Sequence, residues 1–343
     1  MFSTSAITGL NIYNDSYFFI KRSILFTFIG FIALIIGYFI PKKILKSITP
    51  FGLFFSFILM CLCFTPLGSK VGGANRWINT GLFNLQPIEL TKCFLVLYIS
   101  TIFENKKKQI KCFKSGILPI LCIFSSIIVV LLIQPDLGNT ALVMMVLISL
   151  LFLSSIPLWQ LMGIVLSALS IAIISILLQP YQMNRILGFL SPDLDPFGKT
   201  YHISQSLLSI GSGGLWGVGL GQSKLKFFYL PLQYSDFIFS IICEEGGFIL
   251  ATSILCLFLF FLFKSIYIAQ KNSSIFASYT IMGLSLFICY QAFINIGAVI
   301  GLLPITGIPL SFISFGGSSL ITSLFYLGII LNMSLYHQKN NEQ

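Results

Sequence analysis

Nine long apolar runs divide this chain, and each is about as long as the 17–25 residues that a membrane-spanning helix needs. Charged residues are 9% of the chain, against about 25% in a soluble domain, so a soluble core is excluded. The sequence predicts an all-α polytopic membrane protein with one membrane domain over residues 1–343. The runs are 23–40, 51–67, 87–103, 117–134, 138–155, 159–179, 238–263, 275–297 and 312–334.

Basic residues between the runs predict the orientation of the helices. Lysines gather in residues 41–50 and 104–116, which fall on the same side of the membrane. Because cytoplasmic loops carry an excess of Lys and Arg, this side and the C-terminus are predicted to be cytoplasmic. The net charge of +10 follows from this bias, and no nucleic-acid partner is expected. The segments predicted to face outward are 68–86, 135–137, 180–237 and 298–311.

Three of the ten acidic residues fall within QYSDFIFSIICEEGG, residues 233–247. Asp236 lies where the long outer segment enters an apolar helix, so it can cap that helix, act as a general base, or do both. Eight residues of helix place Glu244 about 12 Å from Asp236, beyond the roughly 5–9.5 Å of paired hydrolase carboxylates. Asp236 is therefore expected to act alone, and Glu244 and Glu245 to pair with basic groups.

A second polar cluster lies in GGANRWINTGLFNLQPIELTK, residues 72–92. Glu89 and Lys92 stand three residues apart and can pair on one helix face, and Arg76 lies in the outer segment before them. Two interpretations stay open for these residues: a structural ion pair with an interfacial anchor, or a role in positioning substrate. In QPDLGNT, residues 134–140, a helix-hairpin turn capped by Asp136 is favoured.

The remaining polar motifs favour an anionic ligand and a cavity. Lys199, Lys224 and Lys226 are predicted to face outward, where they suit an anionic ligand or lipid head groups. The glycines of residues 201–231 lack the strand–turn–helix frame of a nucleotide site. Residues 303–319 predict a bent, partly re-entrant segment, which persists only beside a cavity or inside protein. No metal ligands are assigned, because the eight cysteines show no metal or disulfide spacing. An enzyme acting on a lipid-linked phosphate and a transporter both fit.

Seven multi-residue motifs follow one another along the chain: NRWI, QPIELTK, QPDLGNT, DPFGKTYHISQS, GSGGLWGVGLG, YLPLQYSDFIFSIICEEGG and LPITGIPLSFISFGGSS. Together and in this order, they resemble the SEDS family of bacterial cell-wall proteins, which includes FtsW and RodA. The resemblance covers about residues 15–335. It is closer to FtsW in GLGQSKLKFFYLP, whereas GIPLSF is more similar to RodA.

The resemblance implies a peptidoglycan glycosyltransferase that polymerises lipid II at the outer face of the bacterial cytoplasmic membrane, and its FtsW-like motifs imply cell division. The family's essential Asp falls on Asp236, and its paired Glu and Lys fall on Glu89 and Lys92. Implied partners are undecaprenyl diphosphate-linked substrate, a class B penicillin-binding transpeptidase and other divisome membrane proteins. A divalent cation, Mg²⁺ or Mn²⁺, is expected to help the outer Lys and Arg residues stabilise the diphosphate, and no organic cofactor is expected.

The expected reaction is a single inverting displacement with Asp236 as general base. Two other classes remain: a lipid II flippase, and a non-catalytic scaffold for the transpeptidase. A flippase would use acids spread across the membrane depth, whereas the acids here gather toward the outer half.

The chain departs from the family pattern at three motif positions. Tyr234-Ser235 replaces His-Thr, Ser311 replaces a proline, and Phe315 replaces a tyrosine and so lacks its hydroxyl. A catalytic histidine is therefore not expected beside Asp236.

The start of the chain also departs from the family. The family has ten spans and a cytoplasmic N-terminus, whereas residues 12–22 resemble the outer loop after its first span. Lys21 and Arg22 would then flank a span on the outer side, against the positive-inside rule. The family's first span is therefore expected upstream of residue 1.

Overall fold

The computed structural model has an almost wholly helical fold, which confirms the predicted all-α polytopic class. Seven helical segments of the described chain are long and apolar enough to cross a membrane. They are α2 (Phe18–Phe39), α3 (Lys42–Leu62), η1 with α5 (Phe113–Ile117 and Leu118–Ile133), α7 (Leu158–Leu178), α10 (Ile238–Lys271), α11 (Ile275–Val299) and α12 (Gly317–Leu335). The structure describes residues 5, 9–10, 13–71, 74–79, 81, 84–107, 109–154, 156–190, 201–223 and 235–336.

Two more of the predicted apolar runs also form helices. Helix α6 (Leu137–Leu153) is apolar but has only 17 residues, and α4 (Pro87–Asn105) carries Glu89, Lys92 and Glu104. Every predicted run therefore overlaps a helix, although α4 and α6 are not among the seven candidate spans.

The boundary drawn at residues 41–50 was wrong. Helix α3 begins at Lys42 and continues through Pro50, although proline has no backbone N–H to donate inside a helix. Leu45, Thr49 and Gly52 lie three or four residues apart and are all buried. Their packing extends the helix into a segment that its lysines and proline made look like a loop.

Residues 180–237, which the sequence predicts to face outward, contain helices as well as loop. Helices α8 (Pro180–Leu190) and α9 (Tyr201–Ser212) occupy parts of residues 180–237. The segment 68–86 adds a small antiparallel sheet in the order β1-β2-β3 (Gly68–Val71, Ala74–Asn79 and Asn84–Leu85). Pairing in a sheet satisfies backbone groups that would otherwise need water.

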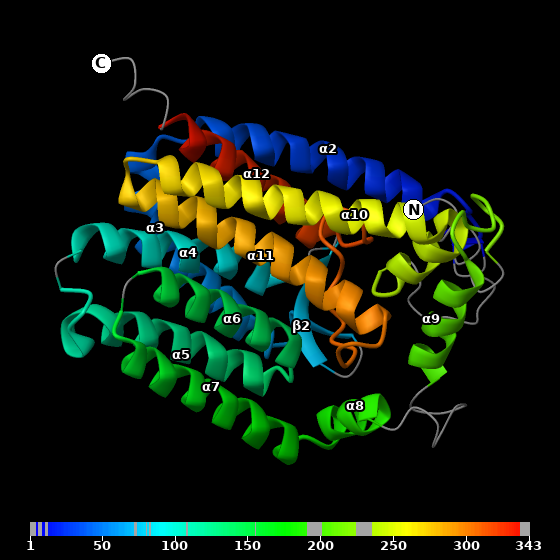
Figure 1. The fold of residues 1–343 in the computed structure, drawn as a ribbon, viewed down its shortest axis with the longest axis horizontal. Helices are drawn as coiled ribbons and strands as arrows, with labels where there is room; N and C mark the ends of the chain where they lie inside the picture. The colour runs from blue at the N-terminus through cyan, green and yellow to red at the C-terminus, as the bar shows by residue number, and fades with distance from the viewer. Residues whose placement is uncertain are drawn as a thin grey trace. The chain divides into compact units, whose positions relative to one another are not determined.

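The chain forms two compact units whose segments alternate along the sequence. In the second unit, α3 packs on α4 and α5, and α5 packs on α4 and α6 (Figure 1). Unit 1 comprises Met1–Ile29, Ile176–Phe261 and Cys289–Leu320, and unit 2 comprises Gly30–Ser175, Leu262–Ile288 and Ile321–Gln343.

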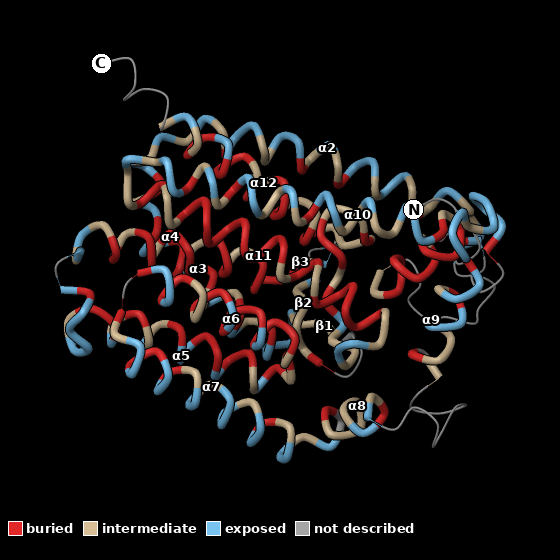
Figure 2. The backbone as a smooth tube through the Cα atoms, viewed as in Figure 1, coloured by how far each residue is buried: buried red, intermediate tan, exposed pale blue. Residues whose placement is uncertain are grey.

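Burial differs sharply between the apolar helices, as Figure 2 shows. Helix α11 is buried over 89% of its apolar window, whereas α7 is buried over only 11%. The exposed side chains of α7 are large and apolar, among them Leu158, Trp159 and Leu178. Such a surface suits contact with lipid, so α11 contributes to the protein core and α7 to the lipid-facing surface.

Candidate active site

Asp236 lies in the turn at residues 235–237, directly before helix α10 begins at Ile238, and it is half-buried. This is the position that the sequence predicted for it. Gly307 lies beside its carboxylate: a Cβ added at Gly307 would stand 3.7 Å from Asp236 Oδ2. Because Gly307 has a φ of +71° and no side chain, its backbone can approach the carboxylate closely.

The segment beside Asp236 is the non-helical stretch 300–316 between α11 and α12. Two buried amides on α11, one helical turn apart, hold it. Gln291 Nε2 donates to Pro309 O at 3.1 Å, and Asn295 Nδ2 donates to Ile308 O at 2.8 Å. Sequence reasoning missed both residues; the available signal was two amides at i and i+4 on an otherwise apolar helix.

Glu244 and Glu245 are both buried in the first turns of α10. The Glu244 carboxylate accepts hydrogen bonds from two hydroxyls, Ser209 Oγ at 3.0 Å and Ser223 Oγ at 2.6 Å. These bonds connect α10 to α9 through Ser209, and to the glycine-rich segment, residues 211–223, through Ser223. The predicted pairing of the two glutamates with basic groups stays a prediction.

The glycine-rich segment forms backbone hydrogen bonds with helix α10 where that helix is broken. Gly247 leaves the helical conformation at φ +68°, which separates backbone groups from their helical partners. The amides of Val218 and Gly219 donate to the carbonyls of Glu244 and Glu245, at 2.9 and 3.1 Å. In return, the amide of Phe248 donates to the carbonyl of Gly214 at 2.9 Å, and that of Ile249 to Leu215 at 3.3 Å. Backbone groups of residues 214–219 therefore satisfy the peptide groups that the break in α10 leaves without helical partners.

In unit 2, Glu89 and Lys92 form the ion pair that their spacing predicted. Lys92 Nζ lies 2.8 Å from Glu89 Oε1, with 0% and 2% of the two side chains exposed. The hydroxyl of Tyr326 on α12 donates to the backbone carbonyl of Glu89. Burial this complete favours a structural role over direct contact with substrate.

Arg76 on strand β2 and Asp136 before helix α6 form a contact that the sequence did not predict. Arg76 Nε lies 3.6 Å from Asp136 Oδ2, and the guanidinium also donates to the carbonyls of Gln134 and Pro135. Asp136 accepts from the Asn139 amide at 3.2 Å, which confirms the predicted helix cap. The QPDLG turn is thus held by a side chain from the small sheet.

Comparisons with known proteins agree across the whole chain. A family model for FtsW, RodA and SpoVE, described as cell cycle proteins, matches residues 1–339. The chain belongs to this family. Its family and its apolar helices indicate an integral protein of the bacterial inner membrane.

Individual relatives and one solved structure are similar over nearly their full lengths. The chain is 38% identical to a probable peptidoglycan glycosyltransferase FtsW of Wigglesworthia glossinidia brevipalpis, over 99% of this chain and 90% of that protein. It is 37% identical to stage V sporulation protein E of Bacillus subtilis strain 168, over 98% and 92%. A chain from a peptidoglycan synthase complex that coordinates polymerization and crosslinking superposes with a TM-score of 0.79 at 25% identity, covering 100% and 96%.

Two positions at which this chain departs from the motifs of the FtsW and RodA family, Phe315 and Ser311, lie among the described residues. Phe315, in place of a tyrosine, packs its ring edge-on against Phe19 at 5.1 Å and near Phe26 at 6.2 Å. Ser311, in place of a proline, is buried. Apolar packing therefore surrounds the position where this chain lacks the hydroxyl.

Three predicted site residues, Lys199, Lys224 and Lys226, lie outside the described residues. Their suggested role toward an anionic ligand stays a prediction.

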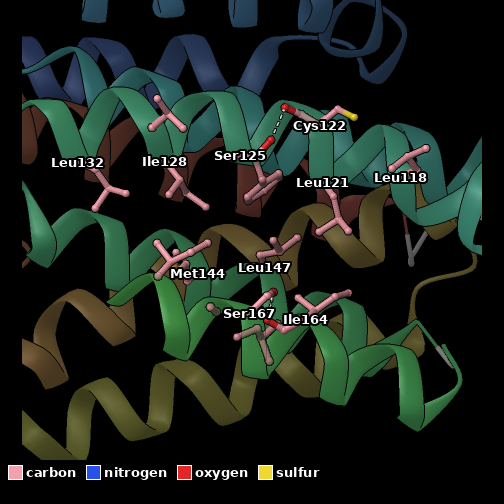
Figure 3. Close-up of a pocket in the computed structure, with 15 residues that line it drawn as sticks. Leu118, Leu121, Cys122, Ser125, Ile128, Leu132, Met144, Leu147, Ile164 and Ser167 are labelled. Atoms are coloured by element: carbon pink, nitrogen blue, oxygen red, sulfur yellow. Dashed lines mark hydrogen bonds between the residues drawn. The ribbon is translucent and has the colours of Figure 1, made fainter. Parts of the chain in front are cut away.

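One cavity of this family member lies between helices α5, α6 and α7 and measures about 430 Å³ (Figure 3). It has no carboxylate, amine, guanidinium or imidazole in its lining. Its hydroxyls already donate within their own helices, Ser125 to the carbonyl of Cys122 and Ser167 to that of Ile164. The cavity therefore suits hydrocarbon and lacks groups for sugar or diphosphate chemistry.

Proposed function

We propose that this protein is a peptidoglycan glycosyltransferase that polymerises lipid II into glycan strands, in cell division. The observation that carries the proposal is Asp236, a half-buried carboxylate at the start of α10. It stands in a chain 38% identical, over 99% of its length, to a protein named as such an enzyme. A carboxylate at the start of a helix, beside Gly307, which carries no side chain, suits a general base.

The proposed step is one displacement at an anomeric carbon. The 4-hydroxyl of the N-acetylglucosamine of lipid II attacks the anomeric carbon of N-acetylmuramic acid at the end of the growing glycan. Asp236 accepts the hydroxyl proton as the new C–O bond forms, and the bond to undecaprenyl diphosphate breaks with its electron pair. General-base catalysis of this kind contributes roughly 10²–10⁴-fold.

The geometry supports a mechanism with one carboxylate. A retaining mechanism needs a second carboxylate as nucleophile about 5–5.5 Å from the first. Glu244 is buried two turns along α10 and already accepts hydrogen bonds from Ser209 and Ser223. Inversion at the anomeric carbon is therefore proposed.

The leaving diphosphate needs positive charge, which we assign to Lys or Arg residues of the outer segments and to a divalent cation. The described residues contain no group of three His, Cys, Asp or Glu side chains that could hold a metal ion by themselves. The described residues thus do not fit a cation site built from protein side chains alone. Mg²⁺ often binds through one or two carboxylates and substrate phosphates, so this expectation depends on the bound diphosphate.

The orientation follows from the lysines. We place residues 104–116 and the C-terminus in the cytoplasm and the turn of Asp236 on the periplasmic side, by the positive-inside rule. Lipid II carries its sugars outside the membrane when it is polymerised, so this orientation brings Asp236 to the substrate.

A class B penicillin-binding transpeptidase is the proposed partner, with other divisome membrane proteins around it. Support comes from the similarity to a chain of a peptidoglycan synthase complex that coordinates polymerization and crosslinking. A partner that crosslinks the strands would act on the product of this step.

The proposal is tested by polymerisation of purified lipid II, with the cognate transpeptidase present, by the wild type and by Asp236→Ala and Asp236→Asn. The wild type is expected to polymerise lipid II roughly 10²–10⁴-fold faster than either variant. Equal rates from all three would move the base to another residue. No polymer from any form, with transbilayer movement of lipid II intact, would favour a flippase. Cells that grow normally with Asp236→Asn as their only copy would favour a scaffold.

A further inference from the structure

Two side chains distant in sequence hold the backbone of Asp236 from both sides. Asn295 Nδ2, on α11, donates to the carbonyl of Asp236 at 2.9 Å. Ser314 Oγ, in the segment before α12, donates to the carbonyl of Ser235 at 2.6 Å. The two peptide groups that set the direction of the Asp236 side chain are thus each fixed by a hydrogen bond from another segment.

We propose that Asn295 and Ser314 are positioning residues for the Asp236 carboxylate. This inference rests on the proposed function, in which Asp236 is the general base. Neither side chain is assigned a contact with substrate; both act on the backbone that carries the base.

The hydrogen bonds of Asn295 support a dedicated role. Its amide nitrogen donates to two carbonyls from different segments, Asp236 O and Ile308 O, so a single side chain fixes the turn and the segment beside it. Its Oδ1 is buried and has no partner among the described residues. Burying an amide with an unmet acceptor costs about 1–3 kcal/mol, so a plain core position would favour an apolar residue. The directional bonds of the amide are what an apolar residue could not supply.

Ser314 joins the same two segments from the other side. While its hydroxyl donates to Ser235, it accepts from the backbone amide of Leu310 at 2.8 Å. The hydroxyl oxygen of Ser314 therefore both stabilises the loop 310–314 and attaches this loop to the Asp236 turn. Together the two side chains connect residues 235–236 to residues 308–314. This segment directly follows Gly307, the residue beside the Asp236 carboxylate.

Loosening this attachment should affect the chemistry more than binding. A misplacement of about 1 Å in a reacting group can cost 10²-fold in rate. An effect confined to the transition state lowers kcat and leaves KM little changed. Asn295→Ala and Ser314→Ala are therefore expected to lower kcat about 100-fold with similar KM for lipid II.

The chain offers a matched control for each change. Asn332, in unit 2, also donates its amide nitrogen to two backbone carbonyls, Gly37 O at 3.3 Å and Ile40 O at 2.6 Å. Ser278, also in unit 2, donates its hydroxyl to a backbone carbonyl on another helix, Ala269 O at 2.6 Å. Asn332→Ala and Ser278→Ala remove similar bonds without releasing the Asp236 turn.

The experiment measures kcat and KM for lipid II polymerisation, with thermal unfolding in detergent, for the four alanine variants and for Ser314→Thr. The expected result is a loss of kcat in the two positioning variants only, at unfolding temperatures similar to their controls. Ser314→Thr keeps the hydroxyl and should regain most of the rate. In an Asp236→Asn background, Asn295→Ala should lower the residual rate no further.

Equal kcat in positioning and control variants, with an active wild type that needs Asp236, would overturn the inference and leave the proposed function standing. An inactive wild type would instead overturn the proposed function. If Asn295→Ala does not fold, Ser314→Ala against Ser314→Thr decides the matter by the same criterion.

Discussion

Lys92 and Glu89 form a salt bridge of 2.8 Å, one helical turn apart on α4, and both side chains are almost fully buried. An ammonium and a carboxylate in such a place are stable only together, since each alone would be a buried charge without compensation. The three-residue spacing places the two side chains on one face of α4, and the packing of the helices then buries both charges together.

Breaking this pair should destabilise the protein strongly. Lys92→Met leaves the Glu89 carboxylate without its ammonium partner and is expected to cost about 3–5 kcal/mol in unfolding free energy. The double variant Glu89→Gln with Lys92→Met should regain most of that stability, because neither charge remains. Thermal unfolding in detergent measures both. Polymerisation activity should return with stability; a stable but inactive double variant would show that the pair positions substrate.

The contact of Arg76 with the QPDLG turn should depend on the shape of the guanidinium. Arg76→Lys keeps the charge but cannot reach the Asp136 carboxylate and two carbonyls together, so a loss of about 1–3 kcal/mol is expected. Hydrogen exchange at residues 134–140 should become faster. Asp136→Asn is the control, since it keeps an acceptor for the Asn139 amide and should show a smaller change. Equal exchange in Arg76→Lys and wild type would contradict the prediction.

Gly217 should not tolerate a side chain. Its φ is +81°, and an added Cβ would lie 2.6 Å from the carbonyl carbon of Glu245 and 2.7 Å from the nitrogen of Gly247. The conformation alone costs about 1–2 kcal/mol, and the backbone collision adds about 1–3 kcal/mol. Gly217→Ala should therefore lower the unfolding temperature and the folded yield. Gly211→Ala, where nothing lies within 4 Å, should be neutral or mildly stabilising, and similar losses in both would refute the argument.

The proposed orientation can be tested with thiol labelling. Cys112 is exposed in the segment placed in the cytoplasm, and Leu302, 70% exposed, lies in a segment placed outside. Two single-cysteine proteins, one retaining Cys112 and one carrying Leu302→Cys, are treated in intact spheroplasts with a membrane-impermeant maleimide. Labelling of Leu302→Cys alone is expected, with Cys112 reacting only after permeabilisation. The reverse pattern would invert the orientation and remove Asp236 from the periplasmic side.

Local features were readable from the sequence because they depend on neighbours along the chain. Apolar runs of sufficient length gave helices, the spacing of Glu89 and Lys92 gave their ion pair, and Asp136 before Asn139 gave a helix cap. The errors also have a local cause. A boundary drawn where the apolar run stopped missed the first turns of α3, because buried Leu45 and Thr49 extend the helix through Pro50.

By itself, the sequence determined the helical membrane class, the family and the position of Asp236 at the start of a helix. Only the tertiary structure decided what holds that position: Asn295 lies 59 residues from Asp236 in sequence, and Arg76 is about as far from the turn it binds. Hydrogen bonds from a side chain to a distant carbonyl leave no periodicity in the sequence, since almost any backbone can accept them. They exist only after the helices have packed and brought one amide or guanidinium within about 3 Å of its acceptor.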